Sequence, residues 1–133
     1  MALLRHRPSR IRYSIDDGPF TEEEINLVVV GNGPYAGGGM KIAPSASMED
    51  GLLDIVTMRG ASRGQMLFRL LPSVYRGRHL GHPAVGYVQA HQIRIESDAP
   101  LSVQIDGEIE GTTPVSIDVF PRALPVWLSP PGA

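Results

Sequence analysis

Residues 31–54, with the sequence GNGPYAGGGMKIAPSASMEDGLLD, decide how this chain folds. They separate two predicted strands, residues 25–30 and residues 52–58, of which the first is a continuous apolar run suited to burial on both faces. Glycine permits close backbone approach and positive φ angles, which a loop or bulge between two such strands requires. The glycines match neither the G-x-x-x-x-G-K-[ST] phosphate loop nor a G-x-G-x-x-G sequence that opens a helix. We therefore interpret the stretch as a loop that lines a cleft, and not as a nucleotide-binding loop.

The rest of the chain has the pattern of an all-β domain. Fifteen glycines and twelve prolines divide it into short segments with turn signals between them. Asp-Gly pairs at residues 17–18, 50–51 and 106–107 lie between apolar stretches, where they favour tight turns. Apolar alternation or continuous apolar runs predict strands at residues 10–15, 25–30, 52–58, 90–96, 101–105, 115–119 and 124–128. Together they predict a mainly β fold, an antiparallel β-sandwich, with residues 1–133 in a single domain.

One helical excursion interrupts the β pattern at residues 62–78. Ser62 and Gln65 predict a capping box at its start, and Gly77 predicts its end. Pro72 predicts that the helix kinks or restarts. The apolar residues at helical spacing are Met66, Leu67, Leu70, Leu71 and Val74. Because several arginines stand among them, the helix is either a surface helix packed on the sheet or an interfacial element that touches anionic lipid.

The composition excludes several classes of protein. Lysine plus arginine number 12 and aspartate plus glutamate 14, so the net charge of −2 gives no general reason to expect nucleic acid as a partner. Cysteine is absent, which excludes disulfides and thiolate metal sites. The first residues lack the apolar core of a signal peptide, and no run approaches the ~18 apolar residues of a spanning helix. We therefore expect a cytoplasmic protein whose contact with a membrane, at its inner face, is peripheral.

Two of the Asp-Gly turns carry carboxylates that could do chemistry. Asp106-Gly107-Glu108 follows an alternating strand, and a hairpin turn explains it, although a hairpin tip is also a rigid platform for a carboxylate that reaches into a cleft. Asp50 precedes Gly51 and an apolar strand, so a turn explains it equally. A single carboxylate with backbone carbonyls in a tight loop is also adequate, although unspecific, for a hard cation.

Other polar residues have simpler interpretations. Glu49 and Asp54 are explained as solvated carboxylates at the entrance of a strand. His79 and His82 are interpreted as part of a polar turn after the helix. The histidines lack the spacing and companion acid of a metalloprotease helix, and no serine lies in a nucleophile elbow, so the sequence gives little support for a hydrolase.

Three motifs resemble those of a known enzyme family. Residues 32–44 read N-G-x-Y-x-G-G-G-M-x-x-A-P, residues 50–54 read D-G-L-L-D, and residues 104–108 read Q-I-D-G-E. These motifs resemble the C-terminal domain of the diacylglycerol kinase and sphingosine kinase type of lipid kinase, and the resemblance extends over residues 13–127. The N-terminal domain of that family, with its G-G-D-G-T nucleotide loop, has no counterpart in these residues. The resemblance therefore implies one half of a two-domain enzyme.

The resemblance also implies roles for the candidate residues. Glu108 would be the general base that accepts the proton of a lipid hydroxyl as the γ-phosphoryl group of ATP is transferred. Asp106 would assist by orientation or by metal contact. A structural Mg²⁺ would be held by the Asp50 carboxylate and by the backbone carbonyls of Ser47 and Leu52. ATP would bind mainly to the missing N-terminal domain, with Mg²⁺ accompanying it.

The glycine-rich loop supplies the candidates for a substrate cleft. These are Asn32, Tyr35 and Gly38, although a turn or packing role explains each of them as well.

The predicted function is that of the C-terminal domain of an ATP-dependent lipid kinase, which phosphorylates a lipid hydroxyl such as that of diacylglycerol. Positioning and charge stabilisation of the phosphates account for most phosphoryl-transfer catalysis, so the chain alone is expected to be inactive. Two alternatives stay open. A non-catalytic lipid-binding module would not need Glu108. A module that docks on a separate kinase chain would expose an apolar flank, and would form a homodimer or aggregate alone.

Overall fold

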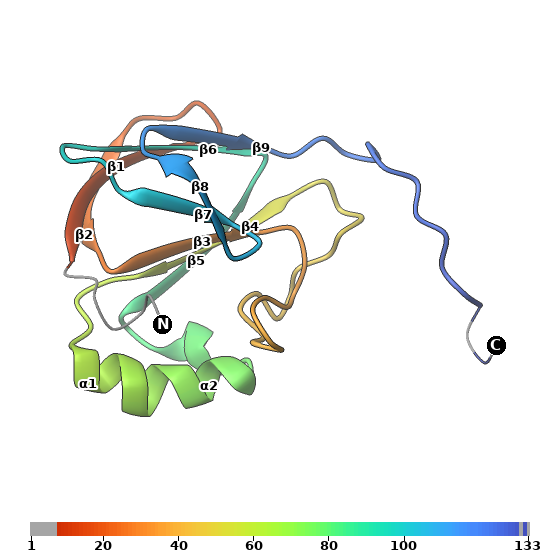
Figure 1. The fold of residues 1–133 in the computed structure, drawn as a ribbon, viewed down its shortest axis with the longest axis horizontal. Coiled ribbons are helices and arrows are strands. Elements are labelled where there is room, and N and C mark those ends of the chain that lie inside the picture. The colour runs from red at the N-terminus through yellow and green to blue at the C-terminus, as the bar shows by residue number, and fades with distance from the viewer. Residues whose placement is uncertain (1–7, 131, 133) are drawn as a thin grey trace.

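The computed structural model describes residues 8–130 and 132 of the chain (Figure 1). Its strands are β1 (Ser9–Ile15), β2 (Thr21–Ile25), β3 (Leu27–Gly31), β4 (Leu53–Met58), β5 (Val85–Ala90), β6 (Gln92–Ser97), β7 (Ser102–Ile105), β8 (Glu108–Thr112) and β9 (Val115–Asp118). Its helical segments are α1 (Arg63–Gln65), the π-helical η2 (Met66–Leu70), α2 (Leu71–Tyr75) and the 3-10 turn η3 (His79–Gly81).

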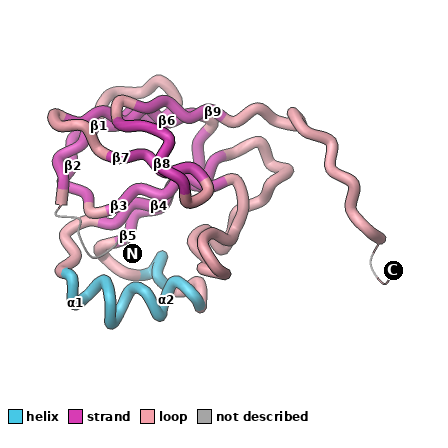
Figure 2. The backbone as a smooth tube through the Cα atoms, viewed as in Figure 1, coloured by secondary structure: helices cyan, strands magenta, loops and turns pink. Residues whose placement is uncertain are grey.

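The strands form a sandwich. Within the described residues, one sheet has the strand order β2-β1-β6-β9, a second has the order β3-β4-β5, and β7 and β8 form a separate hairpin. All of these strand pairs are antiparallel. Figure 2 shows the helices together on one side of the strands, next to β3, β4 and β5. The prediction of a mainly β, antiparallel sandwich with one helical excursion is confirmed.

Strand β4 is the central strand of the sheet β3-β4-β5, and both of its faces are covered. All of its residues are buried. Ile55 belongs to the core between the two sheets, together with Ile93 of the facing sheet. Met58 belongs to a second core beneath the helices, together with Leu70. The sequence predicts a strand at residues 52–58, although two of its buried residues, Asp54 and Thr57, are polar. The run at residues 25–30, which is predicted to be buried on both faces, is only half-buried in β3.

The chain crosses from one sheet to the other at Asn26. Ile25 ends β2 and Leu27 begins β3, so the apolar run predicted as one strand belongs to two. Asn26 donates its backbone N–H to the Met58 carbonyl at 2.7 Å. Its side-chain amide exchanges two hydrogen bonds of 3.3 Å with the backbone of Ala61. The polar side chain thus holds the corner by satisfying backbone groups of the segment that follows β4.

Capping residues set the limits of the helix as predicted. The Ser62 N–H donates to Oε1 of Gln65 at 3.1 Å, and the Gln65 N–H donates to Oγ of Ser62 at 3.3 Å, which completes the capping box. At the other end, Gly77 adopts a φ of +66° and donates its N–H to the Val74 carbonyl at 3.1 Å. Pro72 stands in the first turn of α2, directly after the π-helical segment, because proline has no N–H and crowds the carbonyl four residues earlier. Across residues 8–130 and 132, no helix has the length and apolar content needed to cross a bilayer.

The predicted strand at residues 124–128 is wrong. These residues belong to a tail that extends away from the sandwich beyond β9, and Trp127 is 98% exposed (Figure 1). Pro125 cannot donate to a strand ladder, and the tail pairs with no strand in the described part of the chain. The strands that the apolar pattern does not predict are β2, β5 and β8, with the sequences TEEEI, VGYVQA and EIEGT.

Candidate functional site

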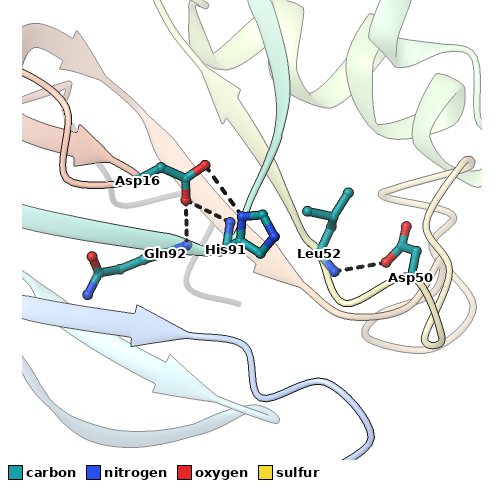
Figure 3. A network of polar contacts seen from close by, with 5 residues as sticks. All are labelled: Asp16, Asp50, Leu52, His91 and Gln92. Carbon is teal, nitrogen blue, oxygen red and sulfur yellow. Dashed lines mark hydrogen bonds and ion pairs between the residues drawn. The ribbon is translucent and has the colours of Figure 1, made fainter.

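The loop that precedes β4 is shaped by its own polar side chains. Oδ1 of Asp50 accepts a hydrogen bond from the Leu52 N–H at 2.9 Å (Figure 3), and Oγ of Ser47 accepts one from the Glu49 N–H at 3.3 Å. Gly51 has a φ of +71°, a conformation that favours glycine. The Asp-Gly pair therefore forms the predicted turn, and the Asp50 side chain is left exposed.

This loop offers oxygen ligands that suit a hard cation. Only Oδ1 of Asp50 is engaged, so within the described residues Oδ2 has no protein partner. Carboxylate and carbonyl oxygens, completed by water, are the ligands that Mg²⁺ prefers. Residues 8–130 and 132 contain no group of three or more histidine, cysteine or acidic side chains that could hold a metal. A cation here would depend on one carboxylate and on the carbonyls of Ser47 and Leu52, which stays a prediction.

Asp106 and Gly107 form the turn between β7 and β8. Their φ angles are +49° and +90°, as a tight hairpin turn requires, so the turn prediction is confirmed. Ile105 pairs with Glu108 across the turn. Glu108 is exposed, and no hydrogen bond or ion pair in the described part of the chain engages its carboxylate. The Glu108 side chain is therefore accessible from solvent, and its role as a general base stays a prediction.

The two carboxylate-bearing turns belong to different parts of the sandwich, because the loop of Asp50 precedes β4 and the turn of Asp106 joins β7 to β8. Among residues 8–130 and 132, no hydrogen bond or ion pair joins Asp50 to Asp106 or Glu108. The chain thus presents the two groups separately.

The glycine-rich loop between β3 and β4 contains a tight hairpin. Ala36 and Met40 exchange backbone hydrogen bonds of 2.9 and 3.0 Å, and the three glycines between them all have positive φ angles. Tyr35 is 62% exposed, and Asn32 and Gly38 are exposed as well. All three residues predicted to line a substrate cleft are therefore accessible to a ligand.

A buried carboxylate near this loop corrects one interpretation. Asp54 is only 1% exposed and is not a solvated carboxylate. Its Oδ1 accepts hydrogen bonds from the Tyr87 hydroxyl and from Nε2 of Gln89, the latter at 3.1 Å, while its buried Oδ2 has no partner. Desolvation, followed by the hydrogen bond and charge of Asp54 and the charge of Asp50, raises the pKa of Tyr87 to about 12. The sequence does show polar side chains at the alternate positions Tyr87 and Gln89, which could have indicated a buried partner. It does not show that β5 pairs with β4, which carries Asp54.

An apolar cavity of about 80 Å³ lies between the helices and the sheet β3-β4-β5. Its lining is Leu27, Val29, Met40, Ile42, Val56, Met58, Met66, Leu70, Leu71, Val74 and His79. His79 begins the turn η3 after the helix, as predicted, but its side chain is only 1% exposed. His82 acts in the same turn, where its Nδ1 accepts the Ala84 N–H. The hydrogen bond of 2.7 Å from Nε2 to the Ile42 carbonyl compensates for the burial of the His79 ring. The other ring nitrogen, Nδ1, is buried without a partner.

A further carboxylate has a structural role. Oδ1 of Asp16 accepts the backbone N–H groups of His91 and Gln92 at 2.8 and 3.0 Å (Figure 3). Desolvation opposes ionisation, but these hydrogen bonds and the nearby His91 ring outweigh it and lower the pKa of Asp16. Asp16 therefore ties the β1-β2 connection to the turn between β5 and β6.

Comparison with known proteins identifies relatives of the whole domain. A diacylglycerol kinase of Mycobacterium tuberculosis (strain ATCC 25618 / H37Rv) is 33% identical over 124 residues, which cover 93% of this chain and 40% of that protein. A diacylglycerol kinase of Bacillus subtilis (strain 168) is 27% identical over 108 residues, which cover 81% of this chain and 35% of that protein. The chain therefore spans less than half the length of these relatives.

A solved structure and a family profile agree with this result. A crystal structure from Bacillus anthracis strain Sterne, described provisionally as a diacylglycerol kinase, superposes with a TM-score of 0.69 at 28% identity. The superposition covers 88% of this chain and 40% of that one. The profile of the YegS C-terminal NAD kinase beta sandwich-like domain matches residues 1–128. The chain belongs to this family of C-terminal β-sandwich domains.

Proposed function

We propose that this chain is the C-terminal domain of an ATP-dependent lipid kinase, in which Glu108 acts as the general base. The observation that carries the proposal is the state of the Glu108 side chain, which is exposed and unpaired at the start of β8. Glu108 belongs to the paired hairpin of β7 and β8. At the end of the hairpin away from the turn, the Thr113 N–H donates to the Leu101 carbonyl at 2.9 Å. The relatives named diacylglycerol kinase support a lipid alcohol as the acceptor.

The proposed reaction transfers one phosphoryl group. The Glu108 carboxylate accepts the proton of the lipid hydroxyl, and the hydroxyl oxygen forms a bond to the γ-phosphorus of ATP. The bond between that phosphorus and the β-γ bridging oxygen breaks, and ADP leaves. Asp106, beside Glu108 in the rigid turn, orients the acceptor or contacts a metal. The lipid hydroxyl reaches Glu108 along the surface that presents Asn32, Tyr35 and Gly38.

The proposed enzyme also requires Mg²⁺, ATP and access to a membrane. The Asp50 carboxylate, with the carbonyls of Ser47 and Leu52, would hold Mg²⁺, which supplies positive charge and fixes the geometry of the loop. ATP would bind mainly to a nucleotide-binding domain outside these residues. The assembled protein would act in the cytoplasm at the inner face of the membrane, where its lipid substrate lies.

A chimeric enzyme tests this function. We would fuse the chain to the part of the Mycobacterium tuberculosis relative that it does not cover, and measure transfer of the γ-phosphate of ATP to diacylglycerol. Glu108→Gln should lower turnover by about 10²- to 10⁴-fold, the usual contribution of a general base. Glu110→Gln, in the same exposed strand, is the matched control and should leave turnover unchanged. A chimera that folds and binds ATP without turnover would contradict the proposed function.

The apolar cavity favours a second candidate, a lipid-binding module without catalysis. Its apolar lining and volume of about 80 Å³ suit the end of an alkyl chain. Binding of a short-chain diacylglycerol to the chain alone, measured by calorimetry, should be weakened by Val56→Phe, which fills the cavity. Binding that is insensitive to Glu108→Gln, in a chain whose chimera shows no turnover, would favour the binding module.

A further inference from the structure

The helix has an outer face that no other part of the described chain covers. Leu70 and Val74 are buried beneath it. Phe68 and Tyr75, at positions i and i+7, point the other way and are 77% and 53% exposed. Figure 1 shows the helix at the edge of the molecule, on the side away from the sheet β2-β1-β6-β9. Exposed aromatic side chains on one helix face indicate a site of interaction.

Positive charge adjoins this aromatic pair in the sequence, because Arg69 follows Phe68 and Arg76 follows Tyr75. Arg69, Arg76 and Arg78 are exposed, and within residues 8–130 and 132 none of them forms an ion pair. Arginines elsewhere do find carboxylates, as in the Arg10–Glu22 pair at 3.3 Å.

The sequence places no carboxylate close to these arginines. All fourteen aspartates and glutamates lie outside residues 55–95, a stretch that contains six arginines. Arg59 and Arg94 of the same stretch nevertheless pair with Glu23 and Asp17 from other segments. Lys41 adds to the charge, because its Cδ lies 3.2 Å from the position that a Cβ on Gly77 would take. The outer face of the helix, defined here as Phe68, Arg69, Tyr75 and Arg76 with Arg78 just beyond the helix end, is therefore cationic although the whole chain carries a net charge of −2.

We propose that the outer face of the helix docks on the surface of an anionic phospholipid bilayer, with the two aromatic rings at the level of the lipid headgroups. Arginines beside exposed aromatic residues are the composition of helices that lie in the membrane interface. An anionic leaflet supplies the negative charge that the protein lacks around this helix. Nucleic acid fits less well, because exposed aromatics on a helix gain most from an apolar boundary and the chain as a whole is acidic.

This docking extends the proposed lipid kinase function, because it would bring the domain to the membrane that holds its acceptor. It can nevertheless be measured without ATP or diacylglycerol. Failure of docking and failure of the kinase reaction are therefore separate results.

Vesicle co-sedimentation of the full chain tests the role of charge. The chain should bind vesicles of phosphatidylcholine with phosphatidylglycerol, and should bind vesicles of phosphatidylcholine alone far less. Each basic residue near an anionic surface strengthens binding roughly fivefold, so the double change Arg69→Gln and Arg76→Gln should weaken binding about 25-fold. The matched control, Arg10→Gln with Arg12→Gln, removes the same charge from arginines paired with Glu22 and Glu96 on the other sheet and should have little effect. Equal weakening by both double variants would overturn the proposal.

A tryptophan reporter tests the aromatic contact in a way that does not depend on loss of binding. In a Trp127→Phe background, Phe68→Trp should show a blue-shifted emission when the anionic vesicles are added. Phe120→Trp is the control, because Phe120 is also 77% exposed but lies beyond β9. A shift at position 120 and none at position 68 would overturn the proposal. So would a dimer in sedimentation analysis that Phe68→Ser dissociates, because a second copy of the chain would then cover this face.

Discussion

The Tyr87 hydroxyl donates a hydrogen bond to Oδ1 of Asp54 and so joins two side chains on neighbouring strands, 33 residues apart in sequence. The Asp54 carboxylate is almost completely buried, on the strand that follows the loop of Asp50. A buried carboxylate is tolerated when hydrogen-bond donors compensate for its lost hydration. The hydrogen bonds from Tyr87 and Gln89 therefore stabilise β4 in its position next to the candidate site.

Removing the Tyr87 hydroxyl should destabilise the domain. Tyr87→Phe keeps the ring but takes one donor from a buried acceptor, which costs about 1–3 kcal/mol in the free energy of unfolding. Urea denaturation measures the change. Tyr35→Phe is the control, because Tyr35 is exposed and makes no hydrogen bond in the described part of the chain. Similar values for the two variants would show that the bond to Asp54 adds nothing to stability.

The Tyr87 phenol should ionise late in an alkaline titration. Its pKa is raised from 10.0 to about 12 in the folded state, so the folded protein holds this proton more tightly than the unfolded chain does. The resulting stabilisation is complete below pH 10 and is lost as the pH rises toward 12. Ultraviolet absorbance of tyrosinate follows the ionisation. Tyr87→Phe should remove one late-titrating group, and an unchanged titration curve would refute the assignment.

Asp16 should make the domain sensitive to acid. Its folded pKa lies below the ordinary 3.8, so its contribution to stability is present above pH 3.8 and is lost as the pH falls through the folded value. Asp16→Asn keeps an acceptor oxygen and tolerates the φ of +50° at this position, but removes the charge. The stability of the wild-type chain should exceed that of the variant at neutral pH, and the difference should shrink in acid. A difference that does not change with pH would exclude a role for the charge.

Magnesium should stabilise the chain through Asp50. If the proposed site forms in the folded state alone, added Mg²⁺ raises the melting temperature by mass action. Asp50→Asn should abolish the increase, because it removes the charged ligand and keeps the shape of the side chain. Asp118→Asn, another exposed carboxylate, should retain the increase. An increase that survives in Asp50→Asn would place the cation elsewhere.

Local physics explains the features that could be predicted. The Ser62 and Gln65 capping box depends on residues within one turn, and the Asp106-Gly107 turn depends on two adjacent φ angles. The position of β4 followed from its apolar residues, but the burial of Asp54 and Thr57 within it did not. The candidate residues Glu108 and Asp50 came from motif resemblance, and their exposure leaves both available for the proposed roles.

The errors involve contacts between distant parts of the chain. The burial of His79 depends on the Ile42 carbonyl, 37 residues away, and an isolated histidine carries no sign of that partner. The apolar tail around Trp127 has the composition of a strand but lacks a neighbour within the described residues, and β8 is a strand although all of its residues are exposed.

The amino-acid sequence by itself determined the turns, the helix limits, the alternation of the main strands and the membership of the family, because these depend on the conformational preferences and order of neighbouring residues. The tertiary structure alone decided which polar groups are buried, that Asp54 is enclosed by Tyr87 and Gln89, and that unpaired arginines and aromatics share one outer helix face. Burial and charge pairing are properties of residues brought together by packing, and their free energies depend on partners that sequence proximity does not specify.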